Sequence, residues 1–472
     1  QLLLKVFCLL AFLLLRSKHI NLLNRFGTAL PQSSSKMLAL TIVGCTRLKG
    51  FAQGRLLIIT SLLSMKILCE TNTMNEFQKY PIIRLKPKVS AGKILAGFPW
   101  VYDNELVLDR RTKKIPAGTI VELQDSERNF LATAVVNSKS KIFARVISKN
   151  NKNIVGSELV LKRISAAKLL RESFFKDPYY RLINSEADRM PGTIIDRFGD
   201  FFVIQPNSVW SENNLENITE ALKQLFNPKG IIKNSNSRAR MLEGLDDCSL
   251  LLHGFIPKTP IKVPMNGAVY MADLNHGQKT GLFYDQRLNH AFLSGISKNK
   301  TVLDVFSHVG GFALAALVGG AVEAIAVDAS EAALKLAEQG AEASGFSSAF
   351  SVLKDDGFSA LTRLKNEGKK FDIVICDPPA FAPSKQALGS GLRAYEKLAK
   401  MSVELVEEGG VLVLCSCSHA ASLSKFREAC IKGVSHGGRR SSIIFTGFAG
   451  PDHPVHPMLS ENGYLKSLFF SL

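Results

Sequence analysis

An apolar run leads into a pair of glycines in the segment Val302-Leu303-Asp304-Val305-Phe306-Ser307-His308-Val309-Gly310-Gly311-Phe312. The apolar run predicts a buried strand, and the two glycines allow a tight turn into a helix. Two other apolar runs end in a similar way. Residues 371–376 lead into Asp377-Pro378-Pro379-Ala380-Phe381, and residues 411–414 lead into Cys415-Ser416-Cys417-Ser418. Ligands of open α/β sheets bind beyond the carboxyl ends of the strands, so we expect a glycine turn, a carboxylate and a thiol to meet there.

Strands and helices alternate from about residue 270 to the end of the chain. The expected strands are 301–306, 323–328, 350–354, 371–377, 411–417, 441–446 and 467–472. Helical periodicity lies between them, notably over 332–343 and 393–406. This alternation is typical of an α/β protein with a doubly wound, mostly parallel sheet of seven strands. The last strand follows no crossover helix, so we expect it to run antiparallel.

Two smaller units are predicted upstream. Short strands separated by turns over 79–152 indicate a small β-barrel, and a polar linker is expected at 148–156. Residues 160–265 indicate an α+β unit with a hairpin turning at Arg197–Asp200, and then a helix. The apolar face of that helix comprises Leu215, Ile218, Leu222 and Leu225. The basic side chains of Lys233, Arg238 and Arg240 either face nucleic acid or lie in a solvated loop.

Composition sets the broad class. The 472 residues carry a net charge of +18, which favours a polyanionic partner, although residues 1–73 hold nine basic residues against one acidic residue. The eight cysteines are irregularly spaced and include no C-x-x-C pair, which favours a reducing compartment and no structural zinc. Residues 1–78 are interpreted as an N-terminal extension, either a presequence or a stretch upstream of a true start at Met65 or Met74. We expect a cytoplasmic protein, or an organellar one if the presequence is genuine.

Two residues are the candidates for catalysis. Cys417 lies past its apolar run and between two serines, which favours a reactive thiolate, although a strand cysteine is commonly an inert apolar side chain. The prolines after Asp377 fix the direction of its carboxylate, which suits holding a base by its amino and ring-nitrogen edge. The alternative for Asp377 is a strand that simply ends in prolines.

Other carboxylates suit a nucleotide. Asp328 ends the second expected strand, where it could accept the hydroxyls of a ribose or cap the following helix. Asp356 could bind an adenine amino group, or form a solvated pair with Asp355. The histidines of Asp452–Pro457 resemble a metal cluster, but the prolines break helical spacing, so we interpret this segment as an ordered loop and expect no metal.

Residues 79–472 resemble the PUA-domain-containing class I rRNA methyltransferases of the large-subunit cytosine-5 type, which use S-adenosylmethionine. The matching stretches are Gly97–Glu105, Glu186-Ala187-Asp188, Pro191-Gly192, Thr280–Arg287, Asp304–Phe312, Asp377-Pro378-Pro379-Ala380-Phe381 and Ser416-Cys417-Ser418. The resemblance implies an RNA-binding PUA-like domain over 79–152, a middle domain over 160–265 and a Rossmann-like catalytic domain over 270–472.

The resemblance also implies roles for individual residues. Cys417 and Asp377 would be catalytic, and the cofactor would bind through Arg287, Asp304, Phe306, Gly310, Gly311, Asp328 and Asp356. The partner would be RNA, with large-subunit rRNA as the expected substrate, no membrane involved and a homodimer left open. Ala380 stands where two-cysteine RNA cytosine methyltransferases carry a second thiol, so another group must remove the C5 proton. Two alternatives stay open: methylation of a purine nitrogen with Phe381 stacking on the base, and a non-catalytic RNA-binding assembly factor.

Overall fold

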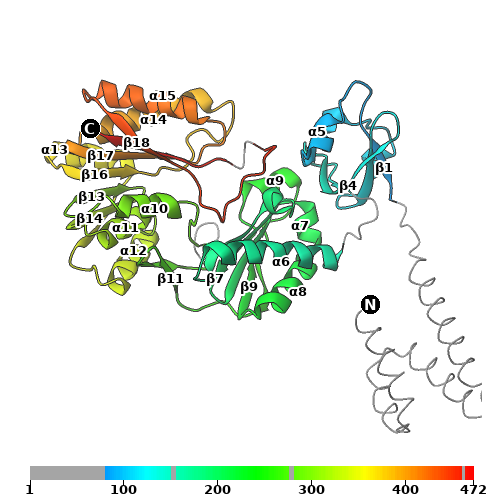
Figure 1. The fold of residues 1–472 in the computed structure, drawn as a ribbon, viewed down its shortest axis with the longest axis horizontal. Coiled ribbons are helices and arrows are strands. Elements are labelled where there is room, and N and C mark those ends of the chain that lie inside the picture. Colours follow the sequence, from blue (N-terminus) through cyan, green and yellow to red (C-terminus); the bar gives the residue numbers. More distant parts are fainter. Residues whose placement is uncertain (1–79, 150–155, 276–280, 460–462) are drawn as a thin grey trace, which may run out of the picture. The chain divides into compact units, whose positions relative to one another are not determined.

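The computed structural model describes residues 80–149, 156–275, 281–459 and 463–472, and residues 80–472 cluster as one structural unit (Figure 1). The extension expected at 1–78, residues 150–155 of the expected linker and Thr280 lie outside the described residues. Within the described ranges, no helix has the length and apolar character needed to cross a bilayer.

Short strands build the first sheet, in the order β1-β3-β4-β5-β2. Alternate side chains such as Val121 and Leu123 are fully buried, as period-2 patterning requires. The β-rich unit predicted for this region is therefore confirmed. Its elements are β1 (Ile82–Arg84), α5 (Gly92–Ala96), β2 (Trp100–Val101), η3 (Asp103–Glu105), η4 (Thr112–Lys114), β3 (Ile120–Gln124), β4 (Phe130–Val136) and β5 (Ala144–Ser148).

A second sheet follows in the order β10-β9-β8-β7-β6. Its predicted hairpin is confirmed, with β7 and β8 antiparallel and Gly199 at a φ of 64° in the turn. The pattern misses α6 because its apolar residues do not share one face, and Leu169 and Phe174 are exposed. The elements are α6 (Ser157–Phe174), β6 (Tyr179–Asn184), η5 (Ser185–Asp188), β7 (Thr193–Phe198), β8 (Phe201–Pro206), α7 (Val209–Asn213), α8 (Leu215–Phe226), β9 (Gly230–Lys233), α9 (Arg238–Glu243) and β10 (Leu250–Gly254).

The expectation that the basic residues of this region face nucleic acid or lie in a solvated loop is wrong for two of the three. Lys233 and Arg240 are buried, and both pair with Glu212 at 2.6 Å, so neither faces nucleic acid or solvent. Burial is possible because the carboxylate satisfies both cations. Arg238 alone of the three is exposed.

The third and largest sheet has the order β15-β14-β13-β16-β17-β19-β18, and a separate hairpin, β11 (Ile261–Met265) with β12 (Ala268–Ala272), precedes it. As predicted, its seven strands are parallel except the last in sequence, β19, which pairs antiparallel with β17 and β18. The strands are β13 (Thr301–Val305), β14 (Glu323–Asp328), β15 (Phe350–Lys354), β16 (Phe371–Cys376), β17 (Val406–Ser416), β18 (Ser442–Gly447) and β19 (Lys466–Ser471).

Helices cover both faces of this sheet (Figure 1). The first group is α10 (Arg287–Ser294), α11 (Gly311–Val318) and α12 (Glu331–Ala343), and the second is α13 (Gly357–Asn366), α14 (Leu388–Val403) and α15 (Leu423–His436). The chain passes from β13 to β14 and β15 on one side and then crosses to β16 on the other. At this reversal a crevice lies at the carboxyl ends of β13 and β16, and its lining includes Asp304, Phe306 and Asp377.

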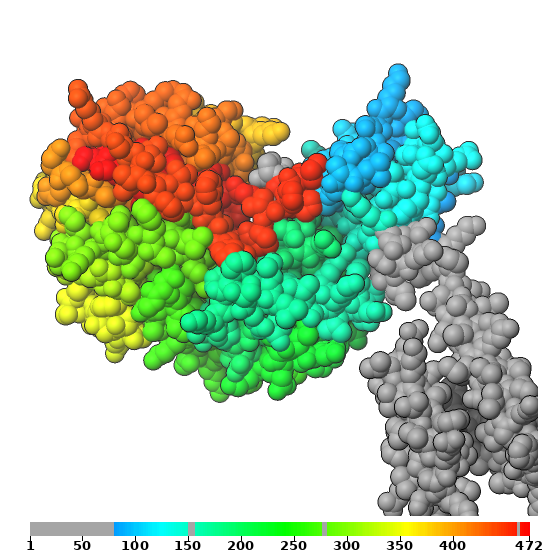
Figure 2. All heavy atoms as spheres, viewed as in Figure 1, coloured from blue at the N-terminus to red at the C-terminus, as the bar shows by residue number. Residues whose placement is uncertain are grey.

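Side chains and backbone connect the three sheets. Arg145 of β5 reaches Glu186 at 2.7 Å and Glu243 at 3.0 Å in the middle region. The segment before β19 contacts the middle sheet, where Asp452 accepts from the Arg181 amide at 3.2 Å. Figure 2 shows this C-terminal part of the chain, in red, against the green middle region.

Candidate active site

The loop between β13 and α11 has an unusual backbone. Phe306 and His308 have φ values of 64° and 50°. This left-handed backbone conformation costs free energy for any residue other than glycine. Gly310 follows at 76°. A Cβ on Gly311 would lie 2.9 Å from the His290 ring, so no side chain fits at the start of α11. Glycine at this position therefore lets the start of α11 pack directly against His290.

Asp304 lies beneath this loop, fully buried. Its Oδ2 accepts from the Ala313 amide at 3.0 Å, whereas Oδ1 has no hydrogen-bond partner among the described residues. Burial raises the pKa of Asp304 to about 7, the Ala313 amide opposes this, and the nearby Asp377 adds to it. A buried oxygen without a partner is costly, and a cationic or hydrogen-bond-donating ligand would satisfy it.

Asp328 ends β14 and braces the same loop. One carboxylate oxygen accepts from the His308 amide at 2.9 Å and the other from the Ser330 amide at 2.8 Å. The helix cap considered as the alternative for Asp328 is supplied by Ser330, whose hydroxyl accepts from Ala333. Asp328 therefore joins two strand ends while its half-buried carboxylate stays at the crevice.

Asp356 lies at the N-terminus of α13. Its Oδ1 accepts from the amides of Phe358 and Ser359, which makes it the N-cap of that helix. The ring of Phe306 packs directly against Gly357, the next residue. A Cβ on Gly357 would lie only 2.3 Å from this ring. Phe306 and Asp356 are thus brought to neighbouring loops at the ends of β13 and β15.

Asp377 and Cys417 meet at the ends of β16 and β17. The Cys417 sulfur lies 4.0 Å from the carbonyl oxygen of Pro378, the residue after Asp377. Asp377 Oδ2 accepts from Gln286 Nε2 at 2.9 Å. Cys417 is half-buried, whereas Cys376 and Cys415 are buried and inaccessible. The pKa of Cys376 rises to about 12 through burial, as expected for an inert thiol.

Tyr395 of α14 holds the two serines that flank Cys417. The Ser416 hydroxyl donates to the Tyr395 oxygen at 2.9 Å, and the hydroxyls of Tyr395 and Ser418 lie 2.8 Å apart. Ser418 also accepts from the Ala382 amide at 2.9 Å, which ties the loops after β16 and β17 together. No motif points to Tyr395, because it lies in mid-helix.

The neighbours Gln286 and Arg287 differ in whether their side chains contact the candidate site. Gln286 was missed as a site residue, although it lies within the stretch that carries the family resemblance. Arg287, predicted to bind the cofactor, lies outside the crevice. Its guanidinium donates to the Tyr179 carbonyl and lies 4.3 Å from the centroid of the Phe175 ring. The structure therefore brings together all the predicted cofactor residues except Arg287.

The histidines of the loop before β19 are held by their neighbours. His453 Nδ1 lies 3.0 Å from Asp452 Oδ1, and both residues are buried. In the described part of the chain, no three His, Cys, Asp or Glu side chains gather as a metal site requires.

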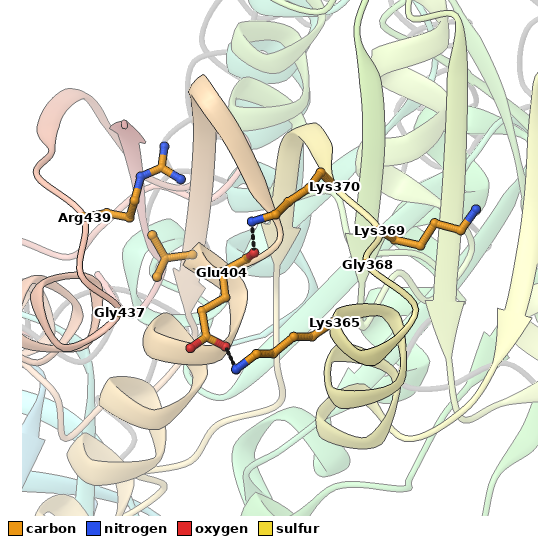
Figure 3. A pocket seen from close by; sticks show the side chains of 8 residues that line it. Lys365, Gly368, Lys369, Lys370, Glu404, Gly437 and Arg439 are labelled. Atoms are coloured by element: carbon orange, nitrogen blue, oxygen red, sulfur yellow. Dashed lines mark hydrogen bonds and ion pairs between the residues drawn. The ribbon is translucent and has the colours of Figure 1, made fainter.

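Another hollow lies at the opposite edge of the large sheet, where β16 and β17 begin (Figure 3). Three of its cations are engaged: Lys365 pairs with the Glu404 carboxylate at 2.6 Å, and Lys370 and Arg439 donate to backbone carbonyls. It contains no predicted site residue. The lining residues are Lys365, Gly368, Lys369, Lys370, Val403, Glu404, Gly437 and Arg439.

Comparison with known families agrees with this geometry. A PUA-like domain model matches residues 83–149, and an S-adenosylmethionine-dependent methyltransferase model matches residues 245–432. The fold is similar to that of a SAM-dependent methyltransferase from Streptococcus mutans, with a TM-score of 0.71 at 22% identity, covering 83% of this chain and 100% of that one. A methyltransferase solved with SAH has a TM-score of 0.72 at 22% identity, covering 84% of this chain and 100% of that one.

Sequence relatives extend the match. Ribosomal RNA large subunit methyltransferase I of Aeromonas salmonicida is 33% identical over 380 residues, 79% of this chain and 95% of that protein. The protein of the same name from Escherichia coli is 31% identical over 377 residues, with the same coverage of both chains. The predicted fold, enzyme class and cofactor are confirmed, while the roles of individual residues stay predictions. The chain belongs to the ribosomal RNA large subunit methyltransferase I family and uses S-adenosylmethionine as its methyl donor.

Proposed function

We propose that this protein methylates C5 of a cytosine in large-subunit ribosomal RNA through a transient bond to Cys417. One observation carries the proposal: a half-buried cysteine at the end of β17 lies 4.0 Å from the loop that holds Asp377. The substrate class follows the names of the relatives, which are ribosomal RNA large subunit methyltransferases.

The residues present fit S-adenosylmethionine. The unpartnered Oδ1 of Asp304 suits a cationic ligand, and the loop from Phe306 to Val309 lines the pocket beside it. We assign the methionine end to this loop, the ribose to Asp328 and the adenine to the neighbourhood of Asp356 and Phe306. The bound cofactor supplies a methyl group on a positively charged sulfur, which becomes a neutral thioether after transfer.

Cys417 would make cytosine reactive. Its thiolate adds to C6, so a C6–S bond forms and the electrons of the C5–C6 double bond make C5 nucleophilic. C5 then takes the methyl group. Loss of the C5 proton to a base returns an electron pair that expels the sulfur, which regenerates the thiolate. Asp377, oriented by Gln286, would accept a hydrogen bond from the amino group of the flipped base.

The surroundings of Phe381 favour cytosine over a purine. Its ring lies 4.9 Å from the ring of Tyr395 and 6.0 Å from that of Phe358, between centroids. An aromatic that stacks on a target base needs a free face, and Phe381, which is partly buried against the core, already packs on these two rings. Phe381 is therefore a packing residue in this proposal.

The RNA backbone would be held by the PUA-like domain. Its η4 turn and the two residues before it carry four exposed cations, Arg110, Arg111, Lys113 and Lys114. Such a cluster suits phosphate contacts, which supply affinity without reading sequence.

The test is methyl transfer from labelled S-adenosylmethionine to ribosomal RNA, followed by nucleoside analysis. Cys417→Ala should abolish 5-methylcytosine formation, whereas Cys248→Ala, which changes an exposed cysteine outside the site, should retain it. RNA containing 5-fluorocytosine should trap a covalent adduct with the wild-type protein. Undiminished 5-methylcytosine from Cys417→Ala, or methylation confined to a purine, would refute the proposal.

A further inference from the structure

Lys466 is a buried cation beside the proposed nucleophile. It is the first residue of β19, and its register partner is Ser416, the residue before Cys417. The residue is only 4% exposed. Two strands therefore bring an ammonium group to the turn that carries the thiol.

The ammonium group is held by that turn. Lys466 Nζ donates to the carbonyl of Ser418 at 2.9 Å and to that of Ala421 at 2.8 Å. These two hydrogen bonds use two of the three protons of the ammonium group. Among the described residues, no carboxylate lies within ion-pair distance of it. A buried ammonium that contacts only neutral carbonyls is poorly compensated, and a neighbouring thiolate would offset the cost.

The pKa of Lys466 also reflects an interaction with Cys417. Burial lowers the pKa of Lys466 to about 8, and the interaction with Cys417 acts in the opposite direction. The coupling is reciprocal, because a cation that gains from a nearby thiolate also stabilises that thiolate. Thiolates are the reactive form of cysteine, and a neighbouring cation is a common means of producing them.

We propose that Lys466 is a positioning residue that keeps Cys417 in its thiolate form and fixes the turn from which it attacks. The thiol proton is released to solvent water, and the ammonium remains bound to the two carbonyls. This proposal rests on the proposed function for its role in catalysis, but not for its effect on the thiol.

Several other groups surround Cys417. The Asp377 loop opposes a thiolate by its negative charge. The two tyrosines are neutral near pH 7, because burial raises the pKa of Tyr395 to about 12 and also raises that of Tyr464 well above its usual range. In the described part of the turn, His419 can also become positive, but it is exposed, so solvent screens it. The groups to control are therefore Asp377 from the β16 loop, Tyr395 from α14, His419 from the same turn, and Tyr464 from the segment before β19.

Thiol titration tests the proposal. The full chain is alkylated with iodoacetamide between pH 5 and 10, and the modification of Cys417 is read by peptide mass spectrometry. Lys466→Gln keeps hydrogen-bond donors for the two carbonyls but removes the charge, and Lys466→Met removes both. At pH 7 the alkylation rate of Cys417 should fall about tenfold in the Gln variant, which corresponds to a rise of about one pKa unit. Cys248, an exposed thiol, is the internal reference and should not change.

The outcomes separate charge from structure. His419→Gln should leave the Cys417 midpoint unchanged, and the methylation lost in Lys466→Gln should recover as pH rises toward 9. A wild-type midpoint in Lys466→Gln overturns the proposal, even if Lys466→Met loses activity or fails to fold. If Cys417→Ala still forms 5-methylcytosine, the proposed function fails, while the titration still reports on Lys466.

Discussion

Gly311 shows how one missing side chain shapes the crevice. A Cβ at this position would lie 2.9 Å from the buried His290 ring, which itself packs on Phe312. We expect Gly311→Ala to cost about 1–3 kcal/mol, because the ring must shift within a packed core. The loop should move with it, so S-adenosylmethionine affinity should fall about tenfold in calorimetry. Gly389→Ala is the control, since its Cβ would meet only the flexible end of Arg393 at 3.7 Å; an equal loss there would contradict the expectation.

We expect Asp304 to make cofactor binding depend on pH. Its pKa is raised to about 7, so the folded protein binds a proton between about pH 4 and 7 that the unfolded chain has lost. This neutral acid contributes stability at low pH, and the contribution decreases as pH rises toward 7. The cationic cofactor requires the carboxylate, so its affinity should fall by up to about tenfold per unit below pH 7.

Calorimetry in buffers of different ionisation enthalpy checks the linkage. The wild-type protein should release a proton on binding S-adenosylmethionine at pH 6. Asp304→Asn should bind weakly and show no pH dependence in this range. A steep dependence that persists in the Asn variant would assign the titration to another group.

At the scale of elements, α14 supports the loop of Cys417. Tyr395→Phe removes the hydroxyl that joins Ser416 and Ser418, which leaves two buried hydroxyls short of a partner at a cost of about 1–3 kcal/mol. We expect the turnover number to fall more than the KM for RNA changes, because the thiol is misdirected while the RNA surface is intact. Tyr179→Phe is the matched control, since no hydrogen bond of its hydroxyl is present among the described residues. Equal turnover in the two variants would contradict this role.

The η4 turn should contribute to RNA affinity by charge alone. Lys113→Glu with Lys114→Glu should weaken RNA binding about tenfold and reduce the salt dependence of binding, since fewer counterions are released. Cofactor affinity should stay unchanged. Lys335→Glu with Lys432→Glu reverses two exposed charges on α12 and α15 and is the matched control. Filter binding at several salt concentrations measures both, and an equal loss in the control would assign the effect to net charge.

At the scale of the whole molecule, one buried cation connects the first two sheets. Arg145 pairs with Glu186 and Glu243, and Trp100 Nε1 donates to Glu186 at 2.8 Å. Arg145→Met would leave two carboxylates buried without their cation, which typically costs about 3–5 kcal/mol. Chemical unfolding should therefore begin at lower denaturant. Lys223→Met breaks an exposed pair with Glu220 and should cost no more than about 1 kcal/mol, so equal effects would contradict the role of the buried cluster.

Local patterns were enough to predict the alternating strands and helices and the positions of Asp304, Asp328, Asp377 and Cys417. Asp304 and Asp328 lie within or at the end of an apolar run, and Asp377 and Cys417 follow one. Parallel strands place their carboxyl ends at the same edge, so proximity follows from order along the chain. Boundaries were less accurate. α14 ends at Val403 rather than 406, because β17 already begins at Val406 and bends at Gly409, whose φ is 74°.

Only the tertiary structure decided which side chains support that edge. Gln286 reaches Asp377 across 91 residues of sequence, and Lys466 reaches Ser418 across 48. Burial also depended on the tertiary structure. The sequence suggests that Lys233 and Arg240 are solvent-exposed cations, whereas in the fold both pair with Glu212. Strand ends are local properties of a sequence, whereas the partners of a side chain depend on how distant segments pack. The sequence alone therefore predicted which strand ends hold the candidate site residues, and packing determined which side chains contact them.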